Sequence, residues 1–320
     1  MLSEFAISAK SLITNVWYQR CIRRCALMKY SSLNVGKFVE ALSREMVRHC
    51  GPVFITPGLN TYPEAMIATG TFGLIDTGKR HVLVTSHHVW KRFEVERRAN
   101  PAALLALALG DHDGCISFTR PDAQILDADE ELDLIVFDFA PEDIRVNREP
   151  VNHAKKWFPI RNWPIQEAVK GETLVIMGFP GKLVTKAGMN CTFRYFPIPL
   201  VVSDVSRRNI AIFNTEENRE VFNDVSRVLG GLSGSPAYLL AGNGAKLVGF
   251  VNSGREFTEG DDRRKLSIFA GCILLTPASI LNADGTICRD AFRLGSTSAF
   301  PSLPRPSAST GAPLAMPFEA

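Results

Sequence analysis

Short apolar segments that alternate with turn residues recur along most of this chain, and they constrain its fold more than any other feature. Apolar segments bounded by glycine, proline, asparagine and aspartate are typical of β-strands. No long helical pattern separates them, so the sequence favours antiparallel barrels over a parallel α/β sheet. The predicted strands are 54–55, 65–75, 82–85, 115–118, 132–139, 173–177, 190–195, 200–204, 210–213, 237–240, 246–252 and 266–275.

The chain divides into four regions by pattern and composition. Its last region is rich in serine, proline, alanine and glycine, and has too little apolar surface to offset the entropy of ordering. We therefore predict a disordered tail there. The regions are an N-terminal extension (1–45), a first β unit (46–150), a second β unit (151–283) and the tail (284–320).

Two segments carry a helical pattern. Phe38, Leu42 and Met46 recur at near-helical spacing, which predicts that the N-terminal extension is helical and amphipathic. The alanine and leucine residues of segment 100–110 predict a helical insertion inside the first β unit.

Composition excludes several classes of protein. A hydrophobic content of 46%, a charged content of 22% and a net charge of +3 are ordinary for a soluble globular protein and do not favour a nucleic-acid partner. The longest apolar run, 102–109, is too short to span a bilayer. Residues 1–30 lack the apolar core and cleavage site of a secretory signal, although an organelle transit peptide and an amphipathic helix both fit their composition.

The seven cysteines are odd in number and scattered, and none forms a Cys-x-x-Cys pair. This pattern implies neither a disulfide framework nor a zinc site, and it favours a reducing compartment. We therefore expect a cytoplasmic protein.

One glycine-rich turn can carry chemistry. In segment 230–236, Gly-Gly-Leu-Ser-Gly-Ser-Pro, glycines flank Ser233. Glycine permits the tight, positive-φ turns that expose a hydroxyl beside backbone N–H groups able to hold an oxyanion. Taken alone, such a segment is more often a plain turn.

Two earlier segments supply what a serine nucleophile needs. Adjacent histidines, His87 and His88, follow the predicted strand 82–85, and Asp133 opens another strand. A serine hydroxyl is a weak nucleophile without a base, and imidazole has a suitable pKa. A carboxylate can in turn orient the imidazole. The shared order and strand context favour a catalytic role for these residues over separate structural ones.

These segments resemble those of chymotrypsin-fold serine peptidases, in particular the trypsin-like, HtrA-type branch. Thr-Ser-His-His-Val at 85–89 resembles the family's Thr-Ala-Ala-His-Val, Glu-Leu-Asp-Leu at 131–134 resembles Asp-Leu-Ala-Leu, and Gly-Leu-Ser-Gly-Ser-Pro at 231–236 resembles Gly-Asn-Ser-Gly-Gly-Pro. Segments 70–75, 171–181 and 249–254 also fit, so the resemblance covers roughly residues 45–283.

The resemblance implies a mainly β protein with two six-stranded antiparallel β-barrels and a closing helix at 277–282. It also implies a serine endopeptidase that acts on polypeptides without a metal or organic cofactor. The catalytic residues would be His88, Asp133 and Ser233, with the oxyanion hole at Gly231 and Ser233. The residues expected to contact substrate are Arg227, near the base of the specificity pocket, and Asn252, Ser253 and Gly254, along the substrate backbone.

The sequence departs from the family at two points. Ser235 replaces a glycine of the nucleophile turn, and no Ile-Val-Gly-Gly start is present. Two other interpretations stay open: a catalytically inactive module that grips an extended peptide, and an interaction protein centred on its N-terminal extension.

Overall fold

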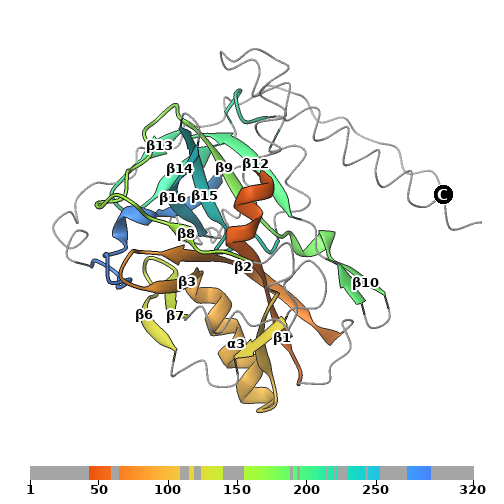
Figure 1. Cartoon of the computed structure of the whole chain (residues 1–320). Helices are drawn as coiled ribbons and strands as arrows, with labels where there is room; N and C mark the ends of the chain where they lie inside the picture. The colour runs from red at the N-terminus through yellow and green to blue at the C-terminus, as the bar shows by residue number, and fades with distance from the viewer. Residues whose placement is uncertain are drawn as a thin grey trace, which may run out of the picture.

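The protein is built mainly from antiparallel β-strands that form two large sheets (Figure 1). The computed structural model describes residues 43–58, 65–108, 115–118, 124–139, 155–187, 190–192, 195–213, 215–219, 221, 230–241, 244–252 and 272–289.

The first sheet has eight strands within the described residues, in the order β5-β4-β1-β2-β3-β7-β6, with β8 pairing β2 in parallel. Because β8 follows residue 150, the second predicted region contributes a strand to the first sheet. The strands are β1 (Cys50–Thr56), β2 (Ile67–Asp76), β3 (His81–Thr85), β4 (Leu104–Ala108), β5 (Cys115–Phe118), β6 (Ile125–Asp129), β7 (Leu134–Asp138) and β8 (Phe158–Pro159).

The second sheet has seven strands within the described residues, in the order β12-β9-β15-β16-β17-β14-β13. Strands β10 and β11 form a separate antiparallel pair. The strands are β9 (Thr173–Gly178), β10 (Thr185–Ala187), β11 (Asn190–Thr192), β12 (Phe196–Val201), β13 (Asp204–Val205), β14 (Ile210–Phe213), β15 (Pro236–Ala241), β16 (Gly244–Asn252) and β17 (Cys272–Pro277).

The second sheet closes on itself. Strands β12 and β13 stand at its two ends, yet only two residues, Val202 and Ser203, separate them in the chain. One continuous run therefore pairs with β9 through its first part and with β14 through its second. This arrangement makes a barrel, and the predicted mainly β class with two antiparallel units is confirmed. The strand counts differ from the predicted six: without the two-residue strands β8 and β13, the first sheet keeps seven strands and the second keeps six.

Alternation along the strands builds three packed layers. In β7, Ile135 and Phe137 enter a core inside the first sheet, whereas Leu134 and Val136 point to the opposite face. That face packs against the second sheet, as expected when successive side chains of a strand point to opposite sides.

Strand β9 alternates in the same way. Leu174 and Ile176 fill the inside of the second sheet, whereas Val175 and Met177 join the core shared with the first sheet. The two sheets are therefore joined by a continuous apolar layer rather than by a few surface contacts.

The predicted helix in segment 100–110 is wrong, because Leu104–Ala108 is strand β4, paired with β1 and β5. Leu105 and Leu107 face the core of the first sheet, and Ala106 and Ala108 lie in a small cluster on the other face. With both faces buried, the strand shows no polar alternation, and its pairing overrides the helical preference of alanine and leucine.

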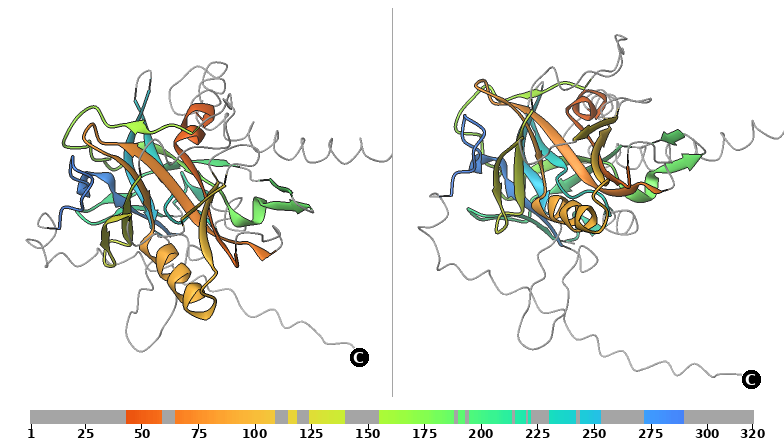
Figure 2. Two further views of the ribbon diagram at one scale, coloured as in Figure 1. Left: turned by 60° about the horizontal axis from the view of Figure 1, so that its bottom comes forward. Right: turned by 90° about the horizontal axis from the view of Figure 1, so that it is seen from below.

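A helix that the sequence pattern did not predict, α3 (His87–Ala99), follows β3 and lies at the outer side of the first sheet (Figures 1 and 2). Val89, Trp90 and Phe93 are its buried residues, at the spacing of one helical face. Its opposite side is charged. The helix therefore covers the first sheet and begins at the histidine pair.

The ends of the described chain are short turns. Residues 43–46 are helical and continue into the 3₁₀ turn η1 (Val47–His49), and the rest of the predicted N-terminal helix lies outside the described residues. The predicted closing helix is only a 3₁₀ turn, η7 (Ala278–Ile280), because Leu281 then bridges back to Ile287. A third 3₁₀ turn, η5 (Gly181–Leu183), follows β9. Within the part of the chain described, no helix is long and apolar enough to cross a membrane.

Candidate active site

The structure brings His88 and Asp133 into direct contact. His88 is the second residue of α3, and Asp133 directly precedes β7. The Nδ1 atom of His88 lies 2.7 Å from Oδ2 of Asp133, and the backbone N–H of His88 donates to Oδ1 at 2.8 Å. The backbone N–H of His87 also donates to the Asp133 carbonyl at 3.2 Å. Of the two adjacent histidines, His88 is therefore the one whose ring meets the carboxylate.

This contact determines which ring nitrogen of His88 can act as a base. An ionised carboxylate only accepts hydrogen bonds, so Nδ1 carries the proton and Nε2 keeps its lone pair. The side chain of Asp133 is 14% exposed, whereas that of His88 is 41% exposed. The carboxylate is therefore shielded while the imidazole can still be reached.

Asp133 lies in a turn with unusual backbone geometry. Its φ is 49°, in the left-handed region that residues other than glycine rarely adopt. Two side chains hold the turn through the backbone of Leu132. Its N–H donates to the Asp129 carboxylate at 2.9 Å, and its carbonyl accepts from Thr276 Oγ1 at 2.6 Å. Strands from both sheets therefore position this carboxylate.

Ser233 lies in the turn that leads into β15, and this turn is bonded to the first sheet. The N–H of Thr71 donates to the Ser233 carbonyl at 2.7 Å. Gly234 packs so closely that a Cβ there would lie 2.9 Å from the backbone nitrogen of Ser86. Ser86 is two residues before His88, so the serine turn and the start of α3 are direct neighbours.

Backbone contacts orient two N–H groups of the serine turn. The Gly230 carbonyl accepts a hydrogen bond from Gly181 in η5 at 2.7 Å, and the Leu232 carbonyl accepts one from Ser235 at 2.8 Å. In a trans peptide the N–H points away from the carbonyl, so the N–H groups of the two following residues face away from these partners. Within the described residues, neither the N–H of Gly231 nor that of Ser233 has an acceptor. Two free N–H donors in one turn suit an oxyanion.

Thr71 connects both sides of the turn. Its hydroxyl donates to the Gly231 carbonyl at 2.9 Å and accepts from the Phe179 N–H at 3.1 Å. Thr71 is fully buried, so both hydrogen bonds form away from water. The family's glycine is replaced by Ser235, whose buried hydroxyl fits because Gly178 opposite has no side chain: a Cβ there would lie 2.3 Å from it.

The predicted triad has a third contact, between the Ser233 hydroxyl and His88. Among the described residues these two side chains form no hydrogen bond. Asn252 is buried, and its amide lies 3.4 Å from Thr276 Oγ1, so only its backbone can meet a substrate. Arg227, Ser253 and Gly254 lie outside the described residues. No three His, Cys, Asp or Glu side chains within the described ranges gather as metal ligands would.

Sequence reasoning missed the residues that hold the site. Thr71 belongs to a segment whose pattern indicates only a strand. The glycine next to it was the one sign that its hydroxyl could contact another segment closely. Thr276 carries no local signal, whereas Ser86 and Gly181 lie inside segments that resemble the family but were not marked as contacts. Each acts across a long sequence separation: Thr276 contacts a residue 144 positions away.

Comparisons with known proteins give a limited result. No known protein family matches the chain, and no curated protein matches its sequence. Among solved structures, a thermostable serine protease, AL20, from an extremophilic microorganism is similar with a TM-score of 0.40 and 12% identity over 73% of this chain and 92% of that one. Deg5 is similar with a TM-score of 0.41 and 14% identity, over 68% and 85%. At these values the similarity assigns no activity, so the chemistry depends on the residues of the site.

Proposed function

We propose that the protein is a serine endopeptidase, with Ser233 as nucleophile, His88 as general base and Asp133 as the residue that orients it. The observation that carries the proposal is the 2.7 Å contact between His88 Nδ1 and Asp133 Oδ2, beside a serine turn that has two free N–H donors. An isolated histidine or a plain glycine turn needs neither feature.

The mechanism follows from the positions of these groups. Nε2 of His88 takes the proton from Ser233 Oγ as the oxygen attacks a peptide carbonyl. The oxyanion that forms accepts hydrogen bonds from the N–H groups of Gly231 and Ser233. The imidazolium then gives its proton to the leaving amine, and water hydrolyses the acyl-enzyme by the same route. The Ser233–His88 hydrogen bond forms when substrate binds, because such bonds are often loose in the free enzyme.

The substrate is proposed to be an extended polypeptide. The backbone of Asn252, at the end of β16, pairs with β17 on one side. The other edge of β16 lies next to the serine turn, because the carbonyl of Val251 accepts a hydrogen bond from the Gly234 N–H at 2.7 Å. A peptide that adds to this edge as a strand would pass the Ser233 hydroxyl. Arg227 is proposed to favour an acidic side chain in the substrate, because guanidinium pairs well with carboxylate.

A single serine substitution tests the activity. We expect Ser233→Ala to lower the rate of peptide hydrolysis by about six orders of magnitude and to abolish labelling by a fluorophosphonate. Ser235→Ala is the matched control, because it removes a hydroxyl from the same turn that has no hydrogen-bond partner in the described structure. Hydrolysis or labelling that survives in Ser233→Ala at the wild-type rate contradicts the assignment.

The second candidate is an inactive module that binds extended peptides. The low exposure of Ser233, 7%, favours it, because a nucleophile has to be reached by its substrate. The same proteins separate the two candidates: if wild-type protein binds a peptide library but neither cleaves it nor reacts with the fluorophosphonate, the binding module is supported.

A further inference from the structure

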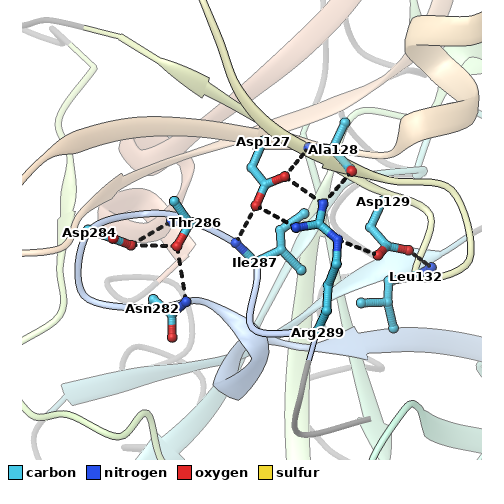
Figure 3. A network of polar contacts seen from close by, with 9 residues as sticks. All are labelled: Asp127, Ala128, Asp129, Leu132, Asn282, Asp284, Thr286, Ile287 and Arg289. Atoms are coloured by element: carbon cyan, nitrogen blue, oxygen red, sulfur yellow. Dashed lines mark hydrogen bonds and ion pairs between the residues drawn. The ribbon is translucent and has the colours of Figure 1, made fainter. Parts of the chain in front are cut away.

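The turn that carries Asp133 is anchored by a carboxylate of β6. One oxygen of Asp129 accepts a hydrogen bond from the Leu132 N–H at 2.9 Å, directly before Asp133 in the chain. The other oxygen accepts one from Nε of Arg289 at 3.2 Å. Asp129 therefore bridges the turn of the proposed catalytic carboxylate and a guanidinium from the far end of the described chain (Figure 3).

Arg289 binds β6 through all three of its nitrogens. Besides Asp129, its terminal nitrogens contact both oxygens of Asp127 at 2.6 and 3.1 Å and the Ala128 carbonyl at 2.7 Å. The planar guanidinium can donate to all of these acceptor oxygens at once, whereas an ammonium group could bind only some of them. The side chains of Asp127 and Asp129 are each 16% exposed, so water competes little for them.

The charges of this network persist at neutral pH. Burial tends to raise the pKa of the Asp127 carboxyl, but hydrogen bonds from Arg289, Ile287 and Ala128 outweigh it and lower the pKa. The hydrogen bond to Asp127 likewise raises the pKa of Arg289. Both partners are therefore ionised wherever the proposed enzyme would work.

Arg289 reaches β6 because the segment after η7 folds back. Leu281 bridges to Ile287, and the Ile287 N–H donates to Asp127 at 2.8 Å. Gly285, with φ 84°, permits the close approach, since a Cβ there would lie 2.8 Å from Val82 and 3.0 Å from Leu126. Residues 284–289, assigned to a disordered tail by the sequence, therefore pack on the first sheet.

We propose that Arg289 is a positioning residue of the peptidase: acting through Asp129, it holds the turn that presents the Asp133 carboxylate to His88. This inference rests on the proposed function. A left-handed turn at a residue other than glycine persists only when its surroundings hold it. Thr276 of β17 supplies one part of those surroundings, and Arg289, from the segment that follows the second sheet, supplies another through Asp129.

Kinetics of Arg289→Ala test the proposal. We expect kcat to fall about 10- to 100-fold, because a small displacement of a reacting group has an effect of that size. KM should stay unchanged, because Arg289 is not part of the proposed substrate edge. Arg289→Lys should recover part of kcat, since one ammonium can pair with a carboxylate but cannot bind all of the acceptor oxygens that Arg289 contacts. An unchanged kcat in Arg289→Ala contradicts the proposal.

The matched control is Arg80→Ala. Arg80 pairs with Asp138 at 2.6 Å, at the opposite end of β7 from Asp133, and no contact of this pair reaches the turn. This substitution also removes an arginine–aspartate ion pair of the first sheet, one that is more exposed than that of Arg289, and we expect no change in kcat. If Arg80→Ala lowers kcat as much as Arg289→Ala, the effect is one of general stability and the proposal is wrong.

A double-mutant cycle tests the route through Asp129. If Arg289 acts through this carboxylate, Asp129→Ala should lower kcat as much as Arg289→Ala, and the two changes together should add little. Full additivity contradicts the route.

An NMR measurement tests the proposal without any turnover. The His88 Nδ1 proton bonded to Asp133 should give a downfield resonance that is lost in Asp133→Ala. We expect Arg289→Ala, but not Arg80→Ala, to shift or broaden it, and an unchanged resonance contradicts the positioning role. If Ser233 proves inactive, this result still decides whether Arg289 holds Asp133, and the proposed function fails separately.

Discussion

The two halves of the proposed site are held in different ways. On the first sheet, His88 and Asp133 depend on side-chain contacts: the imidazole meets the carboxylate, and side chains of Asp129 and Thr276 hold the turn. On the second sheet, the turn around Ser233 depends mainly on bonds between backbone groups, such as Thr71 N–H to the Ser233 carbonyl and Gly181 N–H to the Gly230 carbonyl.

This difference predicts how each half responds to substitution. A side-chain contact can be weakened step by step, so changes on the first sheet should give graded losses of activity. The turn around Ser233 is held mostly by backbone bonds, so a substitution at one of its glycines acts by forcing atoms into occupied space. The nucleophile half should therefore fail as a unit.

The largest effect is expected from Gly234→Ala. Its φ of 82° disfavours any side chain, and a Cβ would lie 2.3 Å from the Thr71 carbonyl and 2.5 Å from Thr85 Oγ1. We expect the free energy of unfolding to fall by about 4 kcal/mol or more, with loss of fluorophosphonate labelling. Denaturant titration and labelling of the purified variant measure both effects.

Gly78→Ala is the control for the backbone term alone. Gly78 has a φ of 79°, but no atom of the described residues lies within 4 Å of the place that a Cβ would take. The free energy of unfolding of the Gly78→Ala variant should therefore fall by only about 1–2 kcal/mol, and the variant should keep its fluorophosphonate labelling. If both glycine variants behave alike, packing does not distinguish the nucleophile turn, and the comparison between the halves is broken.

A smaller effect is expected from Thr71→Val. Thr71 is the residue that joins the two halves of the site. The substitution keeps the shape of the side chain but leaves the Gly231 carbonyl and the Phe179 N–H without the hydroxyl that bonds both. We expect a loss of about 1–3 kcal/mol in the free energy of unfolding. Activity should fall further than this stability loss explains, because the Gly231 carbonyl belongs to the turn that orients the proposed oxyanion donors.

Thr69→Val provides the comparison, since Thr69 Oγ1 donates to a backbone carbonyl of the first sheet, Val53, at 3.2 Å. It also removes a hydroxyl from β2 but does not touch the serine turn. Equal activity in the two threonine variants shows that Thr71 contributes to stability alone.

How much of this could be read from the sequence differs between the halves as well. Ser233 and His88 lie in short motifs whose glycine and strand context survive in the chain, so they could be predicted. Strand β4 could not, because its two buried faces remove the polar alternation that marks a strand. Helix α3 did leave a signal, in the spacing of its apolar residues after Ser86, but the histidine pair was interpreted only through its place after a predicted strand.

The anchoring contacts had no signal of either kind. Arg289 and Asp129 are 160 positions apart, and a lone arginine near a serine-rich region and an aspartate at a strand end are individually common. Only the return of the chain after η7 brings them together. The residues proposed to do the chemistry lie in local motifs, whereas those proposed to position them depend on topology, which a single sequence does not display.

The smallest predicted effect is a dependence of stability on pH that comes from a buried histidine. All six histidines of the chain lie at or before residue 153, and none lies in the second sheet. Burial lowers the pKa of His49, whose Nδ1 donates to the Lys156 carbonyl at 2.8 Å. The unfolded chain therefore binds a proton more readily than the folded one. Stability from this group is full above its unfolded pKa of about 6.5 and is lost as the pH falls below that value.

Replacing this imidazole tests the assignment. We expect His49→Gln to flatten the fall in the free energy of unfolding between about pH 6.5 and pH 5, by about 1.4 kcal/mol for each unit of pKa depression. Urea titrations at several pH values measure it, with His81→Gln as the control, because the His81 side chain is 38% exposed whereas His49 is buried. If the free energy of unfolding of His49→Gln depends on pH as steeply as that of the wild type, the acid sensitivity comes from another group. A flattened slope shows that His49 carries this acid sensitivity of the folded protein.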